Sequence, residues 1–441
     1  MAQVVVFGAG MVARPLVRYL LDQPDTTVVV ATRTVSKAEK MIDGHPQGVA
    51  KTLDVSDMSG VEEEVKAADL VVSLLPYAYH VAVAEFCLTY KKQMVTTSYV
   101  SDAMRELDGR AKEAGIIILN ECGLDPGIDH MSAMRIIHDV EKRGGKIVSF
   151  RSSTGALPAH EANNNPFGYK FSWSPRGVLL ASRNSAKWLE DGKEVDVPGE
   201  RLFENYYILD VPEAGAYENY PNRNSVPYKE IYGLKDAQTV YRGTLRMTGW
   251  CETMRRIVAT GWLQDEPVKG FSGKTFGDMT RHLIGAAGDA DLTEATAKFL
   301  GVDTFATVIK RIGWLGLFSD KPLPEDKDNP LDYMNVLTLE KMAMEDGDRD
   351  MVVMHHEFLA ELPGGDKELL TSTLVDYGIP GGDTSVARTV ALPAAIAVKM
   401  ILSGKIKLSG VYVPVIPEIY NPILDELEEL GVKFVERKEK V

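Results

Sequence analysis

Two glycines and an alanine near the N-terminus have the spacing of a dinucleotide-binding loop. Gly8, Gly10 and Ala13 form the pattern G-x-G-x-x-A after an apolar run, residues 4–7, and before an amphipathic stretch. In this pattern the first glycine permits a tight turn, the second lets the backbone approach a pyrophosphate, and the alanine allows a helix to pack closely on a strand. The N–H groups at the start of that helix can bind the anion. Small residues also occur in plain turns, but the flanking strand and helix favour a cofactor site.

A cation follows the next apolar run, where such folds usually have an acid. The stretch TTVVVATRTVSKAEK, residues 26–40, contains Arg33 beside Thr34 and has no acidic residue before Glu39. A carboxylate here binds the ribose hydroxyls of NAD, whereas an arginine accommodates the 2′-phosphate of NADP. The alternative is a solvated surface arginine. Arg33 therefore predicts NADP(H) rather than NAD(H).

Arginines later in the chain could bind an anionic substrate, because a guanidinium can pair with a carboxylate through two hydrogen bonds. Arg223 lies in the turn-like segment YPNRNS. Arg242, Thr244 and Arg246 lie in YRGTLRM, where the period of two places them on one face of an expected strand. For each single arginine, a surface salt bridge is the alternative.

Asp125, in the segment GLDPGIDH, stands where a helix is expected to begin. As an N-cap, its carboxylate would accept hydrogen bonds from backbone N–H groups of that helix. If it faced a ligand crevice instead, it could bind a substrate ammonium. The two roles are compatible in one residue.

The elements that position these residues are visible as alternating apolar runs and helical patterns over residues 1 to about 125. The pattern predicts an α/β fold with a Rossmann-type, doubly wound parallel sheet, with strands at residues 4–7, 28–31, 49–53, 70–74, 94–97 and 116–119. In such sheets ligands bind beyond the carboxyl ends of the strands. The residues that we expect to contact the cofactor there are Gly8, Gly10, Met11, Val12, Ala13, Arg33, Thr34, Asp54, Val55, Leu75, Pro76 and Tyr77.

The rest of the chain predicts a strand at residues 238–247, a helix-rich block from about 250 to 317, an antiparallel hairpin within residues 350–378 and a C-terminal strand, helix and strand. The apolar segment 386–402 contains Arg388, Pro393 and Lys399, which favours a buried helix over a membrane span. His355 and His356 would alternate faces of a strand, so we interpret them as structural rather than metal-binding.

The composition limits the classes of function. With 441 residues, 45% hydrophobic and 25% charged, the chain has the profile of a globular protein of two or three domains. Its formal charge of −14 disfavours a nucleic-acid partner. Three widely spaced cysteines favour neither disulfides nor a zinc site, and no spacing suggests another metal site. A strand at the very start leaves no room for a signal peptide. We therefore expect a cytoplasmic protein with neither metal nor membrane partner.

Seven segments spread over the chain closely resemble saccharopine reductases, the glutamate-forming saccharopine dehydrogenases of the α-aminoadipate lysine pathway. The segment NPFGYKFSWSPRGVLLA is the most telling, because no generic dinucleotide-binding domain requires it. The other six are GAGMVARP, LLPYAYH, VTTSYVSDAMRELD, NECGLDPGIDH, YPNRNSVPYKE and RGTLRM.

The resemblance implies a dinucleotide-binding domain of residues 1–128, completed by residues 385–441 returning to its sheet. It implies an α/β substrate domain, residues 129–384, with a mixed or antiparallel sheet and a helix-rich subdomain at about 250–320. Fungal members have CRT after the second strand; this chain has TRT, a departure at Thr32 that leaves Arg33 in place. By resemblance the substrate is bound by Ser98, Tyr99, Asp125, Arg223, Thr244, Leu245 and Arg246.

The implied reaction interconverts saccharopine, NADP+ and water with glutamate, 2-aminoadipate 6-semialdehyde and NADPH. Tyr99 and Asp125 are the candidates for acid-base catalysis, although ordered water or the substrate's own amines could suffice. Two alternatives keep the fold: a carboxynorspermidine-type dehydrogenase, and a non-catalytic NADPH-sensing scaffold. A homodimer is the assembly that we expect.

Overall fold

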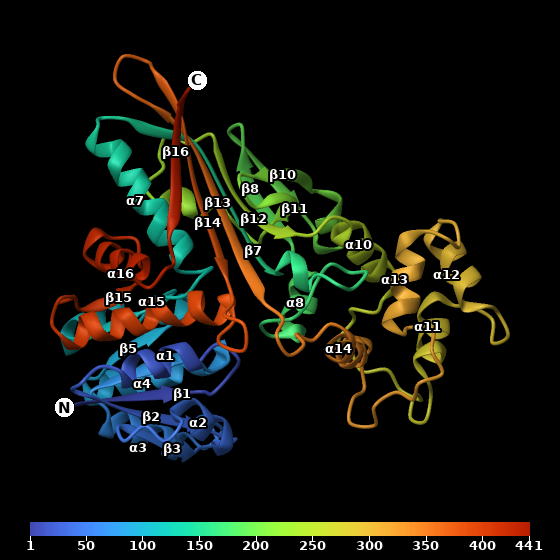
Figure 1. Cartoon of the computed structure of the whole chain (residues 1–441), viewed down its shortest axis with the longest axis horizontal. Coiled ribbons are helices and arrows are strands. Elements are labelled where there is room, and N and C mark those ends of the chain that lie inside the picture. Colours follow the sequence, from blue (N-terminus) through green and yellow to red (C-terminus); the bar gives the residue numbers. More distant parts are fainter. The chain divides into compact units, whose positions relative to one another are not determined.

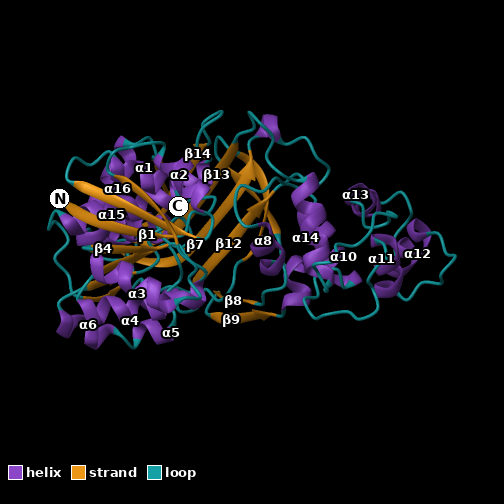
Figure 2. Cartoon of the chain, turned by 90° about the horizontal axis from the view of Figure 1, so that it is seen from below, coloured by secondary structure: helices purple, strands orange, loops and turns teal.

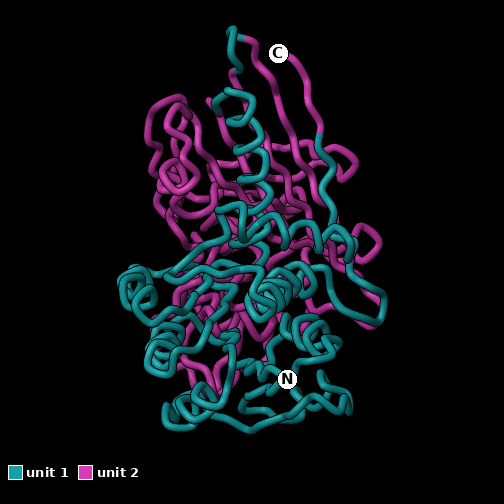
Figure 3. Tube along the Cα trace, turned by 90° about the vertical axis from the view of Figure 1, so that its left-hand side faces the viewer, with its two compact units in different colours: residues 1–146, 362–365, 378–436 teal, residues 147–361, 366–377, 437–441 magenta.

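The structure, a computed structural model, describes residues 1–441 and contains two compact units. Unit 1 comprises residues 1–146, 362–365 and 378–436, and unit 2 comprises residues 147–361, 366–377 and 437–441 (Figure 3). The N-terminal third of the chain therefore shares unit 1 with a segment from the C-terminal region.

The sheet of unit 1 is parallel, with the strand order β3-β2-β1-β4-β5-β6-β15. This is the doubly wound arrangement that the sequence predicted, and the six expected strands are each confirmed to within two residues. The order reverses between β1 and β4, so a crevice forms beyond the carboxyl ends of these two strands. The strands are β1 (Ala2–Phe7), β2 (Thr26–Thr32), β3 (Gly48–Thr52), β4 (Leu70–Ser73), β5 (Gln93–Thr96), β6 (Ile117–Leu119) and β15 (Gly410–Tyr412).

Helices cover both faces of this sheet because its central strands are apolar on both sides (Figure 2). On one face, Val5 and Phe7 of β1 join a buried cluster with Val61 of α3 and Val83 of α4. On the other face, α1 packs against α15. The helices of unit 1 are α1 (Arg14–Leu21), α2 (Val35–Ile42), α3 (Met58–Ala67), η1 (Tyr77–Tyr79), α4 (His80–Tyr90), α5 (Asp102–Arg105), α6 (Asp108–Ala114), α7 (Ile128–Lys142), α15 (Ser385–Leu402) and α16 (Pro417–Glu429).

Helix α15 is long and apolar enough to cross a membrane by length and composition alone, but 72% of it is buried inside the structure. It packs against α1 and α16, and Pro393 lies within it. The prediction of a buried helix is confirmed.

The sheet of unit 2 is mixed, with the order β10-β11-β12-β7-β13-β14-β16 and with β8 and β9 attached through β12. Strands β7 and β12 are parallel, whereas β13 and β14 form the antiparallel hairpin that the sequence predicted (Figure 1). The strands are β7 (Lys146–Pro158), β8 (Ala186–Glu190), β9 (Lys193–Val197), β10 (Tyr207–Val211), β11 (Gly215–Pro221), β12 (Thr239–Arg246), β13 (Asp350–Glu361), β14 (Lys367–Tyr377) and β16 (Phe434–Lys440).

The last strand corrects one expectation from the sequence. Strand β15 joins the parallel sheet, but β16 lies beside β14 in the mixed sheet, so the C-terminal segment does not return to the cofactor sheet as a whole. The charged sequence of β16 suits an exposed edge strand. Lys438 pairs with Glu368 of β14 at 2.8 Å, which favours this position.

Helices α8 and α10 to α14 of unit 2 share one hydrophobic core. Trp250 and Met254 of α10, Met279 of α11 and Leu331 of α14 belong to the same buried cluster. In Figures 1 and 2 helices α11 to α13 lie on the side of α10 and α14 that is remote from the sheet. The helices are η2 (His160–Ala162), α8 (Pro175–Ala181), η3 (Gly199–Glu204), α9 (Tyr228–Ile231), α10 (Trp250–Thr260), α11 (Phe276–Ile284), α12 (Leu292–Leu300), α13 (Thr307–Leu315) and α14 (Pro330–Lys341).

Candidate functional site

The glycine loop lies at the reversal of strand order in unit 1. Gly8 has φ +104°, and a Cβ added there would lie 3.0 Å from the carbonyl oxygen of Leu74, so only glycine fits. A Cβ at Gly10 would meet no atom within 4 Å, which leaves open space beside the backbone. Ala13 is fully buried and precedes the first residue of α1, Arg14. The loop thus has the shape that a pyrophosphate requires at a helix N-terminus.

Arg33 and Thr34 are exposed directly after β2, and Arg33 forms no ion pair within the chain. The exposed carboxylate of Asp54, after β3, has its pKa lowered mainly by hydrogen bonds from Ser56 and to a smaller extent by the charge of Arg33. Arg33 therefore lies near the carboxyl ends of β2 and β3, where the ribose of a dinucleotide binds. An unpaired guanidinium fits a 2′-phosphate there.

Two predicted cofactor residues are apolar and unusually exposed. The side chains of Met11 and Tyr77 are 58% and 82% exposed. Met11 belongs to the loop after β1, and Tyr77 belongs to the segment after β4. Because both segments border the same crevice, these side chains suit contact with the apolar faces of a bound dinucleotide.

Tyr99 and Asp125 are brought together as the sequence analysis expected of one site. Tyr99, after β5, donates a hydrogen bond from Oη to Asp125 Oδ1 over 2.9 Å, and both residues are half-buried. The interpretation of Asp125 as a helix N-cap is wrong. Helix α7 begins at Ile128 with Gly127 as its N-cap and no capping side chain, because two residues separate Asp125 from the first turn. A carboxylate beside a phenol can bind an ammonium group and move a proton.

Ser98 contacts His80, a residue for which the sequence predicted no role. His80 Nε2 lies 2.8 Å from Ser98 Oγ, and His80 Nδ1 lies 2.9 Å from Ser73 Oγ. His80 is 4% exposed, and burial lowers its pKa to about 4. The one indication of a role for His80 in the sequence was its place in the segment LLPYAYH. The hydrogen-bond partners of a lone histidine cannot be inferred from sequence.

Arg246, in unit 2, is a buried cation without a carboxylate partner in the chain. It is 4% exposed, and its guanidinium lies 4.9 Å from the ring centre of Tyr169 and 5.5 Å from that of Trp250. Nη1 donates to the carbonyl of Leu245 over 2.9 Å, while Nε has no hydrogen-bond partner. A buried charge without a counter-ion costs several kcal/mol, of which cation–π contacts recover about 2 kcal/mol. Such a group suits the carboxylate of a ligand.

The other predicted substrate residues of unit 2 differ in exposure. Arg223 is exposed, with φ +53° in the turn after β11. Arg242 is buried against Tyr228, 4.4 Å from its ring centre, and Thr244 is half-buried on the same face. Leu245 is fully buried in a cluster on the opposite face of β12, so its predicted role concerns its backbone.

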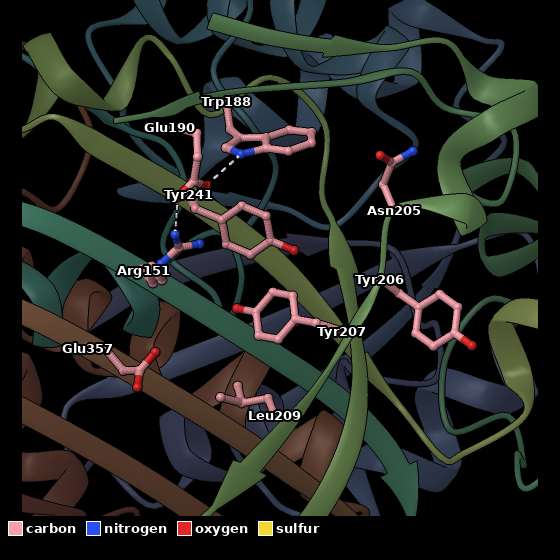
Figure 4. A pocket seen from close by; sticks show the side chains of 9 residues that line it. All are labelled: Arg151, Trp188, Glu190, Asn205, Tyr206, Tyr207, Leu209, Tyr241 and Glu357. Atoms are coloured by element: carbon pink, nitrogen blue, oxygen red, sulfur yellow. Dashed lines mark hydrogen bonds and ion pairs between the residues drawn. The ribbon is translucent and has the colours of Figure 1, made fainter. Parts of the chain in front are cut away.

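A separate pocket of about 540 Å³ opens on that opposite face of the unit 2 sheet (Figure 4). Arg151 of β7 lies opposite Tyr241 of β12 in the sheet and forms an ion pair with Glu190. Burial raises the pKa of the nearby Glu357 carboxyl. The pocket contains none of the predicted site residues. It is lined by Arg151, Trp188, Glu190, Asn205, Tyr206, Tyr207, Leu209, Tyr241 and Glu357.

Two family models together match most of the chain. The model described as Saccharopine dehydrogenase NADP binding domain matches residues 4–119. The model described as Saccharopine dehydrogenase C-terminal domain matches residues 123–432. The first covers the parallel sheet through β6, and the second covers both arginine-bearing segments of unit 2.

Curated relatives match over the full length. A saccharopine dehydrogenase from Schizosaccharomyces pombe, named as NADP(+)-dependent and L-glutamate-forming, is 40% identical over 99% of each chain. The enzyme of the same name from Saccharomyces cerevisiae is 41% identical over 97% of this chain and 96% of its own. The apo structure of the histidine-tagged, L-Glu-forming saccharopine dehydrogenase from Saccharomyces cerevisiae superimposes with a TM-score of 0.90 at 40% identity, covering 100% of both chains.

Proposed function

Because the chain belongs to the saccharopine dehydrogenase family, we propose that it interconverts saccharopine, NADP+ and water with L-glutamate, L-2-aminoadipate 6-semialdehyde and NADPH. This is a step of lysine metabolism by the α-aminoadipate route. The observation that carries the proposal is similarity to three glutamate-forming enzymes at 40–41% identity over nearly the whole chain. The protein is an NADP-dependent oxidoreductase.

The cofactor is held by the loops at the carboxyl ends of the unit 1 strands. Gly8 and Gly10 keep the space beside the start of α1 clear for the pyrophosphate. Arg33 binds the 2′-phosphate of the cofactor, with Thr34 beside it. Met11 and Tyr77 contact the apolar faces of the dinucleotide. When bound, NADP(H) donates or accepts the hydride that is exchanged with a carbon next to the substrate nitrogen.

Saccharopine has three carboxylates, and the arginines of unit 2 are proposed to bind them. Arg246 supports this role because its buried charge has no counter-ion in the chain. Arg223 supplies a second, exposed guanidinium. Thr244 and the backbone of Leu245 complete the set. Two cations would bind two of these carboxylates, which a diamine substrate would not require.

Tyr99 and Asp125 are proposed to serve the amine chemistry. In the reductive direction the amine of glutamate adds to the aldehyde, and the resulting hydroxyl must leave as water. Tyr99 Oη donates a hydrogen bond to Asp125 Oδ1 over 2.9 Å, so the carboxylate can accept a proton from the nitrogen and the phenol can supply one to the leaving oxygen. Asp125 also provides a negative charge for the substrate ammonium.

Three further properties are proposed from the sequence: a cytoplasmic location, a homodimer, and two folding domains with the boundaries expected above, except that strand β16 belongs to the sheet of unit 2. Light scattering coupled to size exclusion would measure the assembly, and a monomeric mass would contradict the dimer.

A steady-state assay in the reductive direction tests the function. The semialdehyde is combined with NADPH or NADH and with glutamate, lysine or a diamine as the amine donor. We expect turnover with NADPH and glutamate. Turnover with diamines alone would favour a carboxynorspermidine-type dehydrogenase, and NADPH binding without turnover on any donor would favour a non-catalytic scaffold.

A further inference from the structure

His80, the first residue of α4, links two serine hydroxyls within unit 1. Ser98 is half-buried and is one of the residues that the family resemblance implies for substrate binding, whereas Ser73 is the last residue of β4 and is fully buried. Both ring nitrogens of His80 are therefore engaged. Which of them carries the hydrogen decides what Ser98 can offer to a ligand.

The buried hydroxyl of Ser73 determines the position of that hydrogen. The only hydrogen-bond partner of Ser73 Oγ is His80 Nδ1, at 2.9 Å. If Nδ1 carried the hydrogen, the O–H of Ser73 would lack an acceptor, and a buried donor without an acceptor is unfavourable. Ser73 therefore donates to Nδ1. Because burial lowers the pKa of His80 to about 4, the ring is neutral near pH 7, and its single hydrogen is on Nε2.

The consequence concerns Ser98. Nε2–H of His80 donates to Ser98 Oγ over 2.8 Å, so the hydroxyl hydrogen of Ser98 points away from the imidazole. We propose that His80 is a positioning residue, which orients Ser98 so that its hydroxyl donates a hydrogen bond to a carboxylate oxygen of the substrate. The inference rests on the proposed function, because that function supplies the carboxylate.

The same contacts argue against a proton-carrying role for His80. A carrier must alternate between protonation states and connect the site to solvent. Ser73 is fully buried and has no further hydrogen-bond partner, so this chain of hydrogen bonds ends in the core. The imidazole thus fixes a direction and moves no proton.

Nitrogen NMR of the full-length enzyme, labelled at its histidine nitrogens, reads the tautomer directly. The signals of His80 are those lost in His80→Gln. We expect a neutral ring with hydrogen on Nε2 near pH 7. A ring with hydrogen on Nδ1, or a charged ring, would overturn the proposal.

Kinetics test the consequence for Ser98. His80→Leu removes the donor, so kcat/KM for saccharopine should fall roughly three- to tenfold, as for one neutral hydrogen bond. His80→Gln offers an amide N–H near the position of Nε2 and should restore part of that loss. In a Ser98→Ala background, His80→Leu should have no further effect. NADP affinity should not change in any of these variants.

His138 provides a matched control, since it is a half-buried histidine of unit 1 whose Nδ1 lies 2.7 Å from the hydroxyl of Tyr420. His138→Gln should leave kcat/KM unchanged. If His80→Leu lowers kcat/KM equally with and without Ser98, its role is structural and the proposal fails. Unchanged kcat/KM in Ser98→Ala would also overturn the proposed role of His80. The proposed function would stand in that case, because the variant would still turn over saccharopine.

Discussion

A buried guanidinium without a carboxylate partner weakens a folded protein, so its presence at position 246 calls for a ligand. The exposed Arg223 gives no such signal by itself, because surface arginines are common. Arg246 lies over two aromatic rings that hold it in place without neutralising it. Tyr169, one of these rings, comes from the segment NPFGYKFSWSPRGVLLA, which gives a physical role to the most distinctive motif of the chain.

Replacing Arg246 with methionine should separate activity from stability. Loss of a desolvated charge pair with a substrate carboxylate should cost about 2–5 kcal/mol in kcat/KM for saccharopine, or about 30-fold to several thousandfold. The melting temperature should stay the same or rise, because an unpaired buried charge is removed. Steady-state kinetics and thermal denaturation measure the two effects.

Arg201 is the control for this experiment, because its side chain is 66% exposed and pairs with Glu204. Arg201→Met should leave kcat/KM unchanged. A large fall in melting temperature for Arg246→Met, with NADP affinity falling as far as saccharopine affinity, would instead make Arg246 a structural residue.

Arg33 should set the choice of cofactor. A charge-assisted contact with the 2′-phosphate contributes about 1.5–3 kcal/mol, equivalent to about ten- to hundredfold in affinity. Arg33→Asp should therefore weaken NADP(H) by that factor and leave NAD(H) turnover similar or better. Lys40→Asp makes the same charge change at the exposed far end of α2 and should alter neither NADP(H) affinity nor NAD(H) turnover. Unchanged cofactor preference in Arg33→Asp would contradict the assignment.

At this scale the sequence predicted residue types better than their partners. The charges at Asp125 and Arg246 could be selected from their local setting. The hydrogen bond from Tyr99 to Asp125, and the contact of His80 with Ser98, join residues on different elements of unit 1. No local pattern encodes such pairs. For the same reason Asp125 was open to interpretation as an N-cap, although the helix starts three residues later.

At the scale of elements, the parallel sheet was the most predictable part of the fold. Its strands are short apolar runs buried on both faces, which few other structures explain. Strand β16 was assigned to the wrong sheet because a charged run carries no information about its neighbour. Its ion pairs with β14 and with the turn before it became visible only in three dimensions.

The loop after β1 supplies a matched pair of element-scale variants. Gly8→Ala should destabilise the fold by about 1–2 kcal/mol, because φ is +104° and the new Cβ would lie 3.0 Å from a carbonyl oxygen. In Gly10→Ala the new Cβ would have no atom of the chain within 4 Å, so the melting temperature should match that of the unmodified protein. NADP affinity should fall, because the Cβ would occupy the space that the pyrophosphate needs. Denaturation and cofactor titration measure both. Normal NADP affinity in Gly10→Ala would contradict the placement of the pyrophosphate.

At the scale of the whole molecule, the resemblance read from seven segments is confirmed by similarity over nearly the full chain, and so is the use of NADP(H). Motif spacing and periodicity alone predicted a dinucleotide-binding α/β protein with a cation, Arg33, at the ribose of the cofactor. They could not predict saccharopine as the substrate, because substrate identity depends on side chains from segments that are distant in the sequence. The division into residues 1–128 with 385–441, and 129–384, stays a prediction, except that strand β16 belongs to the sheet of unit 2.

The identity of the reaction depends on which carbon–nitrogen bond of saccharopine is broken. Oxidation on one side of the secondary amine releases glutamate, and oxidation on the other side releases lysine. A displacement of about 1 Å at the reacting carbon can change a rate about a hundredfold, so one enzyme is expected to use one side. The family to which the chain belongs includes the glutamate-forming enzymes that it matches over 96–99% of their length.

Mass spectrometry of the products formed from saccharopine and NADP+ identifies the bond that the enzyme breaks. We expect glutamate and 2-aminoadipate 6-semialdehyde in equal amounts, with one NADPH formed for each molecule of saccharopine oxidised. Lysine and 2-oxoglutarate as the products would contradict it.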